Sequence, residues 1–111
     1  MPLVIKLLGH GAISGAATTA LYTVPASPTA LGAIVNNVRL VNTAGSSTTV
    51  NLYFTPSGGS QIRILDKDKS IAAGDILVVK PELTMAPSDK IELITIAGAA
   101  LEHVTSGVEK Q

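Results

Sequence analysis

The chain has 111 residues, of which 46% are hydrophobic and 14% are charged, with eight basic and eight acidic side chains that cancel to a net charge of zero. This length fits one domain, and high hydrophobicity without net charge excludes a disordered chain. The scattered basic residues and only three aromatic residues exclude the basic, base-stacking surface of a nucleic-acid-binding protein. Because the apolar runs fall far short of the roughly 20 residues of a membrane span, we also expect no membrane partner.

The first element is an apolar stretch, Pro2 to Leu8, that predicts an extended N-terminal arm. Lys6 interrupts it and no positive region precedes it, so we expect no cleaved signal peptide. The arm either pairs with its own sheet as an edge strand or adds to a neighbouring subunit or shell. We favour the second placement and expect these arm residues to contact another subunit: Leu3, Val4, Ile5, Leu7 and Leu8.

The next segment, GHGAISG from Gly9 to Gly15, resembles two glycine motifs and matches neither. For the dinucleotide fingerprint G-x-G-x-x-G, the third glycine comes one residue late. For G-x-S-x-G, Gly11 lies three residues before Ser14. Because glycine is conformationally permissive, we interpret the segment as a flexible bend that divides the chain into an arm and hinge, residues 1–16, and a domain, residues 17–111.

Short runs of strand-forming residues follow. ALYTVPA, Ala20 to Ala26, predicts a strand that ends at a proline. Ile34–Asn42 and Thr48–Thr55 predict two strands around the small-residue turn NTAGSS. Asparagine, glycine and serine suit a hairpin turn, so we expect these two strands to form an antiparallel hairpin.

Strict alternation in Thr48–Thr55 predicts the direction of its side chains. Val50, Leu52 and Phe54 fall on one face, which we expect to enter the core. Asn51 and Tyr53 fall on the other face. That face is wet or in contact with a partner, and we include Tyr53 in the expected subunit interface.

The second half of the chain also consists of short strand-forming runs separated by turns. We expect a loop at Ser57–Gln61, a short strand at Ile62–Leu65, a turn at 73–75 and an apolar strand at Ile76–Lys80. Another short segment lies within Pro81–Lys90. The strands Lys90–Ala97 and Leu101–Glu109 are expected to form a final hairpin around Gly98. Turn signals recur about every 8–12 residues, which favours a single antiparallel β-sandwich, jelly-roll-like or immunoglobulin-like. The fold class is therefore all-β. Without cysteine, such a chain must rely on its core, on oligomerisation or on a larger assembly.

Candidate chemistry is sparse. His10 and His103 are the two histidines, and they lack the further ligands of a zinc site. No spacing supports a triad of Ser14 and His103 with an aspartate. We therefore expect no catalytic, cofactor-binding or metal-binding residues, and no enzymatic activity.

Two acidic patterns have simpler interpretations. DKDK, Asp66 to Lys69, matches the start of a calcium loop but has Ile71 where the loop needs glycine. We interpret it as a solvated tip. Glu92 and Glu102 could face each other across the last hairpin, but three aromatic residues are too few for a glycosidase cleft.

The segment ALYTVPASPTALGAIVNNVRLVNTAGSSTTVNLYFTPSGG, Ala20 to Gly59, resembles small virion proteins of tailed bacteriophages. The likeness lies in LYTVPA, a strand ending in VNT, VNLY with a glycine-rich loop, and further on SIAAGDILVV and VTSGVE. It covers most of the chain beyond the arm. These motifs are structural, so the resemblance transfers no catalytic residue.

The resemblance implies a virion structural protein made in the host cytoplasm. We favour a capsid decoration (cement) protein, which would act without cofactors, bind the major capsid protein as a homo-oligomer, preferably a trimer, and stabilise the assembled shell by mass action. A tail, neck or fibre protein is the alternative. A carbohydrate-binding sandwich domain is a more distant one.

Overall fold

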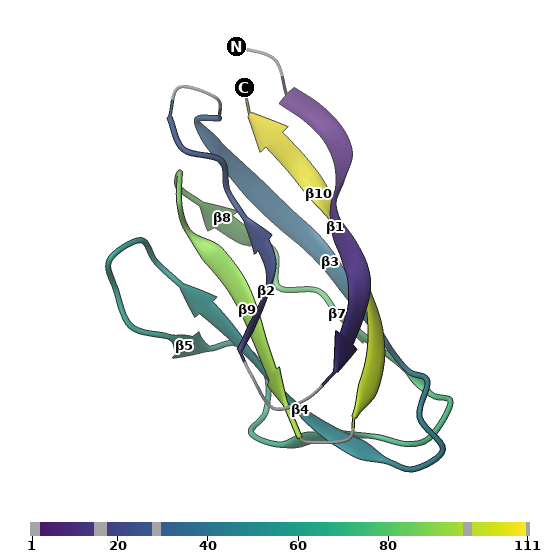
Figure 1. Ribbon diagram of the computed structural model, residues 1–111. Coiled ribbons are helices and arrows are strands. Elements are labelled where there is room, and N and C mark those ends of the chain that lie inside the picture. The colour runs from purple at the N-terminus through teal and green to yellow at the C-terminus, as the bar shows by residue number, and fades with distance from the viewer. Residues whose placement is uncertain (1–2, 15–17, 28–29, 97–98, 111) are drawn as a thin grey trace.

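The computed structural model describes residues 3–14, 18–27, 30–96 and 99–110, which form two antiparallel sheets packed face to face (Figure 1). The first sheet contains β1 (Leu3–Ser14), β10 (Ala100–Lys110), β3 (Gly32–Asn42), β7 (Ile76–Val79) and β8 (Leu83–Met85), in the order β1-β10-β3-β7, with β8 also paired to β3. The second sheet contains β2 (Thr19–Thr23), β9 (Lys90–Thr95), β4 (Thr48–Thr55), β5 (Ile62–Arg63) and β6 (Lys69–Ile71), in the order β2-β9-β4-β5, with β6 also paired to β4. The prediction of an all-β sandwich is confirmed.

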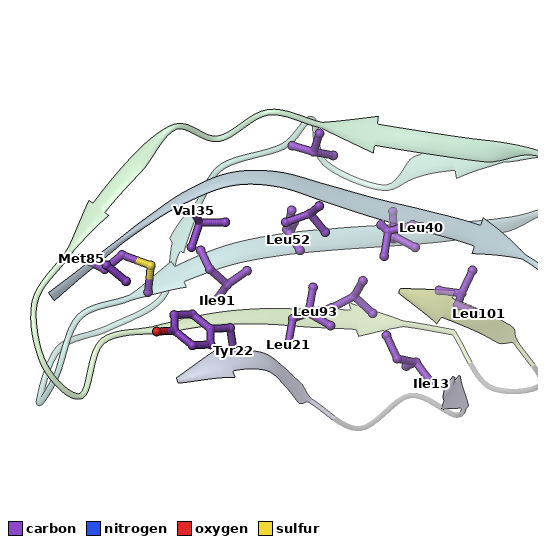
Figure 2. Close-up of a cluster of buried hydrophobic side chains, with 14 of the residues drawn as sticks. Ile13, Leu21, Tyr22, Val35, Leu40, Leu52, Met85, Ile91, Leu93 and Leu101 are labelled. Atoms are coloured by element: carbon purple, nitrogen blue, oxygen red, sulfur yellow. The ribbon is translucent and has the colours of Figure 1, made fainter. Parts of the chain in front are cut away.

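The core fills the space between the sheets (Figure 2). Alternate residues of each long strand point inward, as period-two strands require. Leu40 from the first sheet and Leu52, Ile91 and Leu93 from the second are fully buried. Over the described ranges, the structure contains no helix long and apolar enough to cross a membrane.

The predicted register of β4 is confirmed. Val50 and Leu52 have no exposed surface, and Phe54 is half-buried against the core. Asn51 and Tyr53 lie on the opposite face, where both are partly exposed. The alternation in Thr48–Thr55 therefore reports correctly which side of the strand is buried.

Both predicted hairpins are wrong. β3 and β4 lie in different sheets, and so do β9 and β10. Each connection crosses from one sheet to the other instead of turning back within one. Alternation shows which face of a strand is buried, and a hairpin and a crossover both direct their apolar faces at the same core, so the sequence pattern fits both.

Asn42 anchors the crossover from β3 to β4. Its side chain is fully buried and donates hydrogen bonds to the carbonyl oxygens of Ser46, Ile71 and Ala72 at 2.9, 3.0 and 3.3 Å. Its own amide oxygen accepts a bond from the Ala44 N–H at 3.0 Å. One asparagine thus satisfies backbone groups on both sides of the crossover, and its short amide suits this local bonding.

The segment expected to be an arm forms β1, which pairs along its length with β10 of the same chain. This is the edge-strand placement in the parent sheet, so the placement that we favoured, in which the segment adds to a neighbouring subunit or shell, is wrong. The register runs from Leu3 opposite Lys110 to Ser14 opposite Ala100, with a bulge between Leu7 and Gly9. Gly9 and Gly11 therefore lie inside a paired strand, and the interpretation of this part of the glycine segment as a flexible bend is wrong; Gly15 lies outside the described residues.

Gly9 is needed because the two sheets come close at this edge. A Cβ atom at Gly9 would lie 2.3 Å from the carbonyl oxygen of Leu21, which is far inside van der Waals contact. Leu21 sits at a bulge of its own, between Ala20 and Tyr22 in the pairing of β2 with β9. Bulges increase local twist and bend edge strands, and here the two bulged edges meet and close one side of the sandwich.

Candidate interaction surface

The outward side of the first sheet is unusually apolar. Cross-strand pairing aligns Val104, Arg39 and Val78 in one row, and Glu102, Val41 and Ile76 in the next. Further along, Val108 pairs with Ile34, and Ile34 pairs with Thr84. We call this surface the apolar face and define it by the outward side chains Leu7, Ile34, Val41, Ile76, Val78, Val104 and Val108.

Several of these side chains are well exposed. Ile76 exposes 55% of its surface, Leu7 52%, Val104 43%, and Ile34 and Val78 41% each. Isolated exposed apolar residues are ordinary, whereas contiguous apolar patches mark interaction sites. The adjacency of these rows makes this surface the strongest candidate for binding a partner.

A groove opens at one end of the apolar face. Its volume is about 470 Å³, and its apolar walls come from Leu31, Ile34, Met85 and Val108. Lys110 also lines it, and Asp89 lies deeper, where its carboxylate accepts bonds from the backbone N–H groups of Ser57 and Ala86, both at 2.9 Å. The Asp89 carboxylate is thus engaged in fixing loops.

The outward side of the second sheet is different. Asn51 donates a hydrogen bond to the Asp68 carboxylate at 2.9 Å and accepts one from Arg63. The Arg63 guanidinium also lies 5.1 Å from the centre of the Tyr53 ring. The Thr55 hydroxyl donates to Glu92. These polar side chains of β4, β5, β9 and the loop before β6 therefore have partners within the chain.

A polar seam lies inside the sandwich along β10. The Tyr22 hydroxyl donates a 2.7 Å hydrogen bond to the carboxylate of the buried Glu109. Burial, and then this bond and the negative charge of Glu109, raise the pKa of Tyr22 well above its usual range. The tyrosine therefore stays protonated and acts as a fixed donor.

His103 belongs to the same seam. It is buried and approaches the Thr105 hydroxyl at 3.4 Å, with its ring against the backbone of Gly9 and Gly11. Desolvation, and to a smaller extent the charge of His10, lower the pKa of His103 below its usual value of 6.5. His10 is exposed and faces outward beside Val104. The two histidines thus point to opposite sides of the first sheet.

The residues expected to form a subunit interface do not share one surface. Leu7 is on the apolar face, Leu8 packs against the core, and Tyr53 lies on the outward side of the second sheet. The backbone of Leu3–Ile5 pairs with β10, whereas the side chains of these three residues fall outside the described part of the structure.

The remaining motifs also separate. Glu92 and Glu102 lie on different sheets, so they do not face each other across a hairpin. Asp66 to Asp68 are exposed, in keeping with a solvated tip, but Lys69, the last residue of this motif, begins β6 and pairs with Val50. Ser14 pairs with Ala100, whereas His103 pairs with Gly11, three residues earlier. Among the described residues, no three acidic or histidine side chains gather as a metal site would require.

The apolar face was missed from the sequence, although one signal was present. The run ILVV in β7 is continuously apolar, whereas a strand with one wet side alternates. Continuous apolar character is typical of a strand covered on both faces. Alternation in β3 and β10 is less informative, because Ile34, Val104 and Val108 interrupt polar outward positions.

Neither a family model nor a curated protein sequence matches the chain. Solved structures do match it. A chain in the structure of infectious bursal disease virus, Gx strain, aligns with a TM-score of 0.59 and 11% identity over 99% of this chain. A chain of the Gt strain of the same virus aligns with a TM-score of 0.55 and 10% identity over 97% of this chain.

The match covers 32% and 30% of the two viral chains, so this protein spans about a third of their length. At such low identity the likeness establishes the fold, which is a β-sandwich of a kind found in a virus structure.

Proposed function

We propose that this protein is a structural component of a virus particle and, more specifically, a capsid decoration protein of a tailed bacteriophage. The observation that carries the proposal is the fold likeness over nearly the whole chain to chains in two structures of a virus. The resemblance of Ala20–Gly59 to small phage virion proteins supports it independently.

The surfaces of the molecule support a binding role rather than catalysis. The apolar face offers a broad area for contact, whereas the polar groups of the second sheet are bonded to one another. A protein that binds only the assembled lattice stabilises it by mass action, without any chemical step. In the proposed role the chain is a homo-oligomer, with a trimer implied by the resemblance, attached to the major capsid protein.

The carbohydrate-binding alternative requires an open aromatic surface on which a sugar ring can stack. Tyr53 is the one partly exposed tyrosine, and the Arg63 guanidinium lies over its ring. The structure therefore favours the virion role over carbohydrate binding.

The test is to locate the protein on particles. Virions of the phage that encodes the chain are purified and labelled with gold-conjugated antibody against it. Gold distributed over the head supports decoration, whereas gold at the neck, tail or fibres supports the alternative position in the virion. Particles that lack the protein altogether contradict both.

A further inference from the structure

The starting point is the uneven distribution of exposed apolar side chains. In the described part of the chain, eight large hydrophobic residues are exposed, and five of them lie on strands of the apolar face: Leu7, Ile34, Ile76, Val78 and Val104. A sixth, Leu31, directly precedes β3 and lines the groove. A surface of this kind is costly to leave in water.

The two ends of this face are complementary to each other. One end carries the most exposed side chain of the face, Ile76, in the same cross-strand row as Glu102. The other end carries the groove between Leu31, Ile34 and Val108, with Lys110 beside it. A protruding apolar side chain and the Glu102 carboxylate thus lie at one end. The other end has the apolar groove and the exposed Lys110, because the Asp89 carboxylate in the groove is already bonded to backbone N–H groups. The exposed Arg39 lies between the two ends, in the row of Val104 and Val78.

We propose that the apolar face binds a second copy of this chain. The two faces are stacked about a two-fold axis that lies in the plane between them and runs perpendicular to the strands, so the strands of the two copies are antiparallel. A two-fold interface is isologous, so each contact occurs twice. Reversing the strand direction brings Ile76 of each copy over the groove of the other. The same operation brings Glu102 of each copy to the end of β10 where Lys110 of the other lies.

The area available agrees with a stable dimer. β3 and β10 have 11 residues each. With a length of about 3.3 Å per residue and a width of about 4.8 Å for each of four strands, the sheet offers roughly 700 Å² per copy. A standard interface buries about 800 Å² per partner. Two sheets packed face to face commonly align within about 30° of each other, so this geometry is ordinary for β-sandwiches.

Self-association explains why the Ile76 and Glu102 end of the apolar face is complementary to its groove and Lys110 end, whereas binding to a flat shell surface does not. Binding to a lattice of another protein would require an apolar face but no match between its own two ends. The proposal does not depend on the virion role, because the purified chain alone carries both complementary ends. It specifies two-fold association, whereas the resemblance implies a trimer.

The first test is the oligomeric state of the purified protein by sedimentation equilibrium. We expect the wild type to be a dimer at micromolar concentration. We expect Ile76→Glu to dissociate at least about ten-fold more readily, because it would bury an unpaired charge in the apolar groove of the other copy. Ile62→Glu is the matched control, because Ile62 is 53% exposed on β5 of the second sheet. Circular dichroism and a thermal melt establish that both variants are folded.

The second test uses charge reversal. Glu102→Lys and Lys110→Glu each place like charges together twice in a homodimer, so each variant alone should be monomeric where the wild type is a dimer. Mixing the two variants restores opposite charges at both sites, so the mixture should form a heterodimer. A monomeric wild type, a trimer, or a mixture that stays monomeric would overturn the proposal.

Discussion

Replacing Gly9 with alanine tests whether the N-terminal segment is a strand packed into the sandwich or a hinge outside it. The added Cβ atom would lie 2.3 Å from the carbonyl oxygen of Leu21, and the carbonyl carbon is at 3.5 Å. The obstacle is backbone, which cannot rotate away as a side chain can. Relief requires β1 and β2 to separate by about 1 Å, and overpacking of this kind costs about 1–3 kcal/mol.

The assay is equilibrium unfolding in urea, with the free energy of unfolding compared between variants. Gly45→Ala is the matched control, because a Cβ atom at Gly45 would meet nothing within 4 Å. It should change the free energy of unfolding by less than about 0.5 kcal/mol. If Gly9→Ala is as neutral as this control, then β1 does not pack against β2 as described, and the result would support a hinge outside the sandwich.

Three further predictions concern the core, a buried histidine and the arm. Leu52→Ala should lower the free energy of unfolding by about 2–5 kcal/mol because Leu52 is fully buried, and Asn51→Ala should lower it much less. Equal losses for the two variants in a urea titration would refute the register of β4. His103 holds its proton more weakly in the fold than in the unfolded chain, so its contribution to stability is complete above about pH 6.5 and is lost as the pH falls through the lowered folded-state pKa. Thermal melts across this range should show a decline that His103→Gln reduces, and an unchanged pH profile in that variant would contradict the assignment. Deletion of residues 2–8 removes the first half of β1 and Leu8, which packs against the core, so it should lower the free energy of unfolding as well as weaken self-association by sedimentation. A truncated protein as stable as the wild type would contradict the pairing of this segment with β10.

Local patterns in the sequence were sufficient for most of the strands, although they missed β6 and the second half of β1. Alternation over Thr48–Thr55 correctly predicted a strand with these bounds and the burial of Val50 and Leu52, although the predicted hairpin partner was wrong. The turn at 73–75 is also present, with Gly74 at a φ of 76° and Asp75 N–H bonded to the Ala72 carbonyl oxygen. These features depend on a few neighbouring residues, and side-chain period and turn chemistry are local properties.

Sheet membership depends on contacts between residues far apart in the chain. The loop after Asn42 has the composition of a hairpin turn, yet it crosses between sheets because Asn42 binds the carbonyl oxygens of Ile71 and Ala72, 29 and 30 residues away. Only the assembled structure brings these partners together. The same applies to Gly9, whose neighbour is the backbone of Leu21 on the opposite sheet.

The sequence by itself determined an all-β domain and which face of strand Thr48–Thr55 is buried. Only the tertiary structure decided that the outward apolar residues of β3, β7 and β10 gather on one sheet, while the polar outward residues of β4 and β9 bond to one another on the other sheet. The physical reason is that alternation assigns each residue to a side of its own strand. Whether those sides join into one continuous surface depends on strand order and register, which are fixed by hydrogen bonds between distant segments.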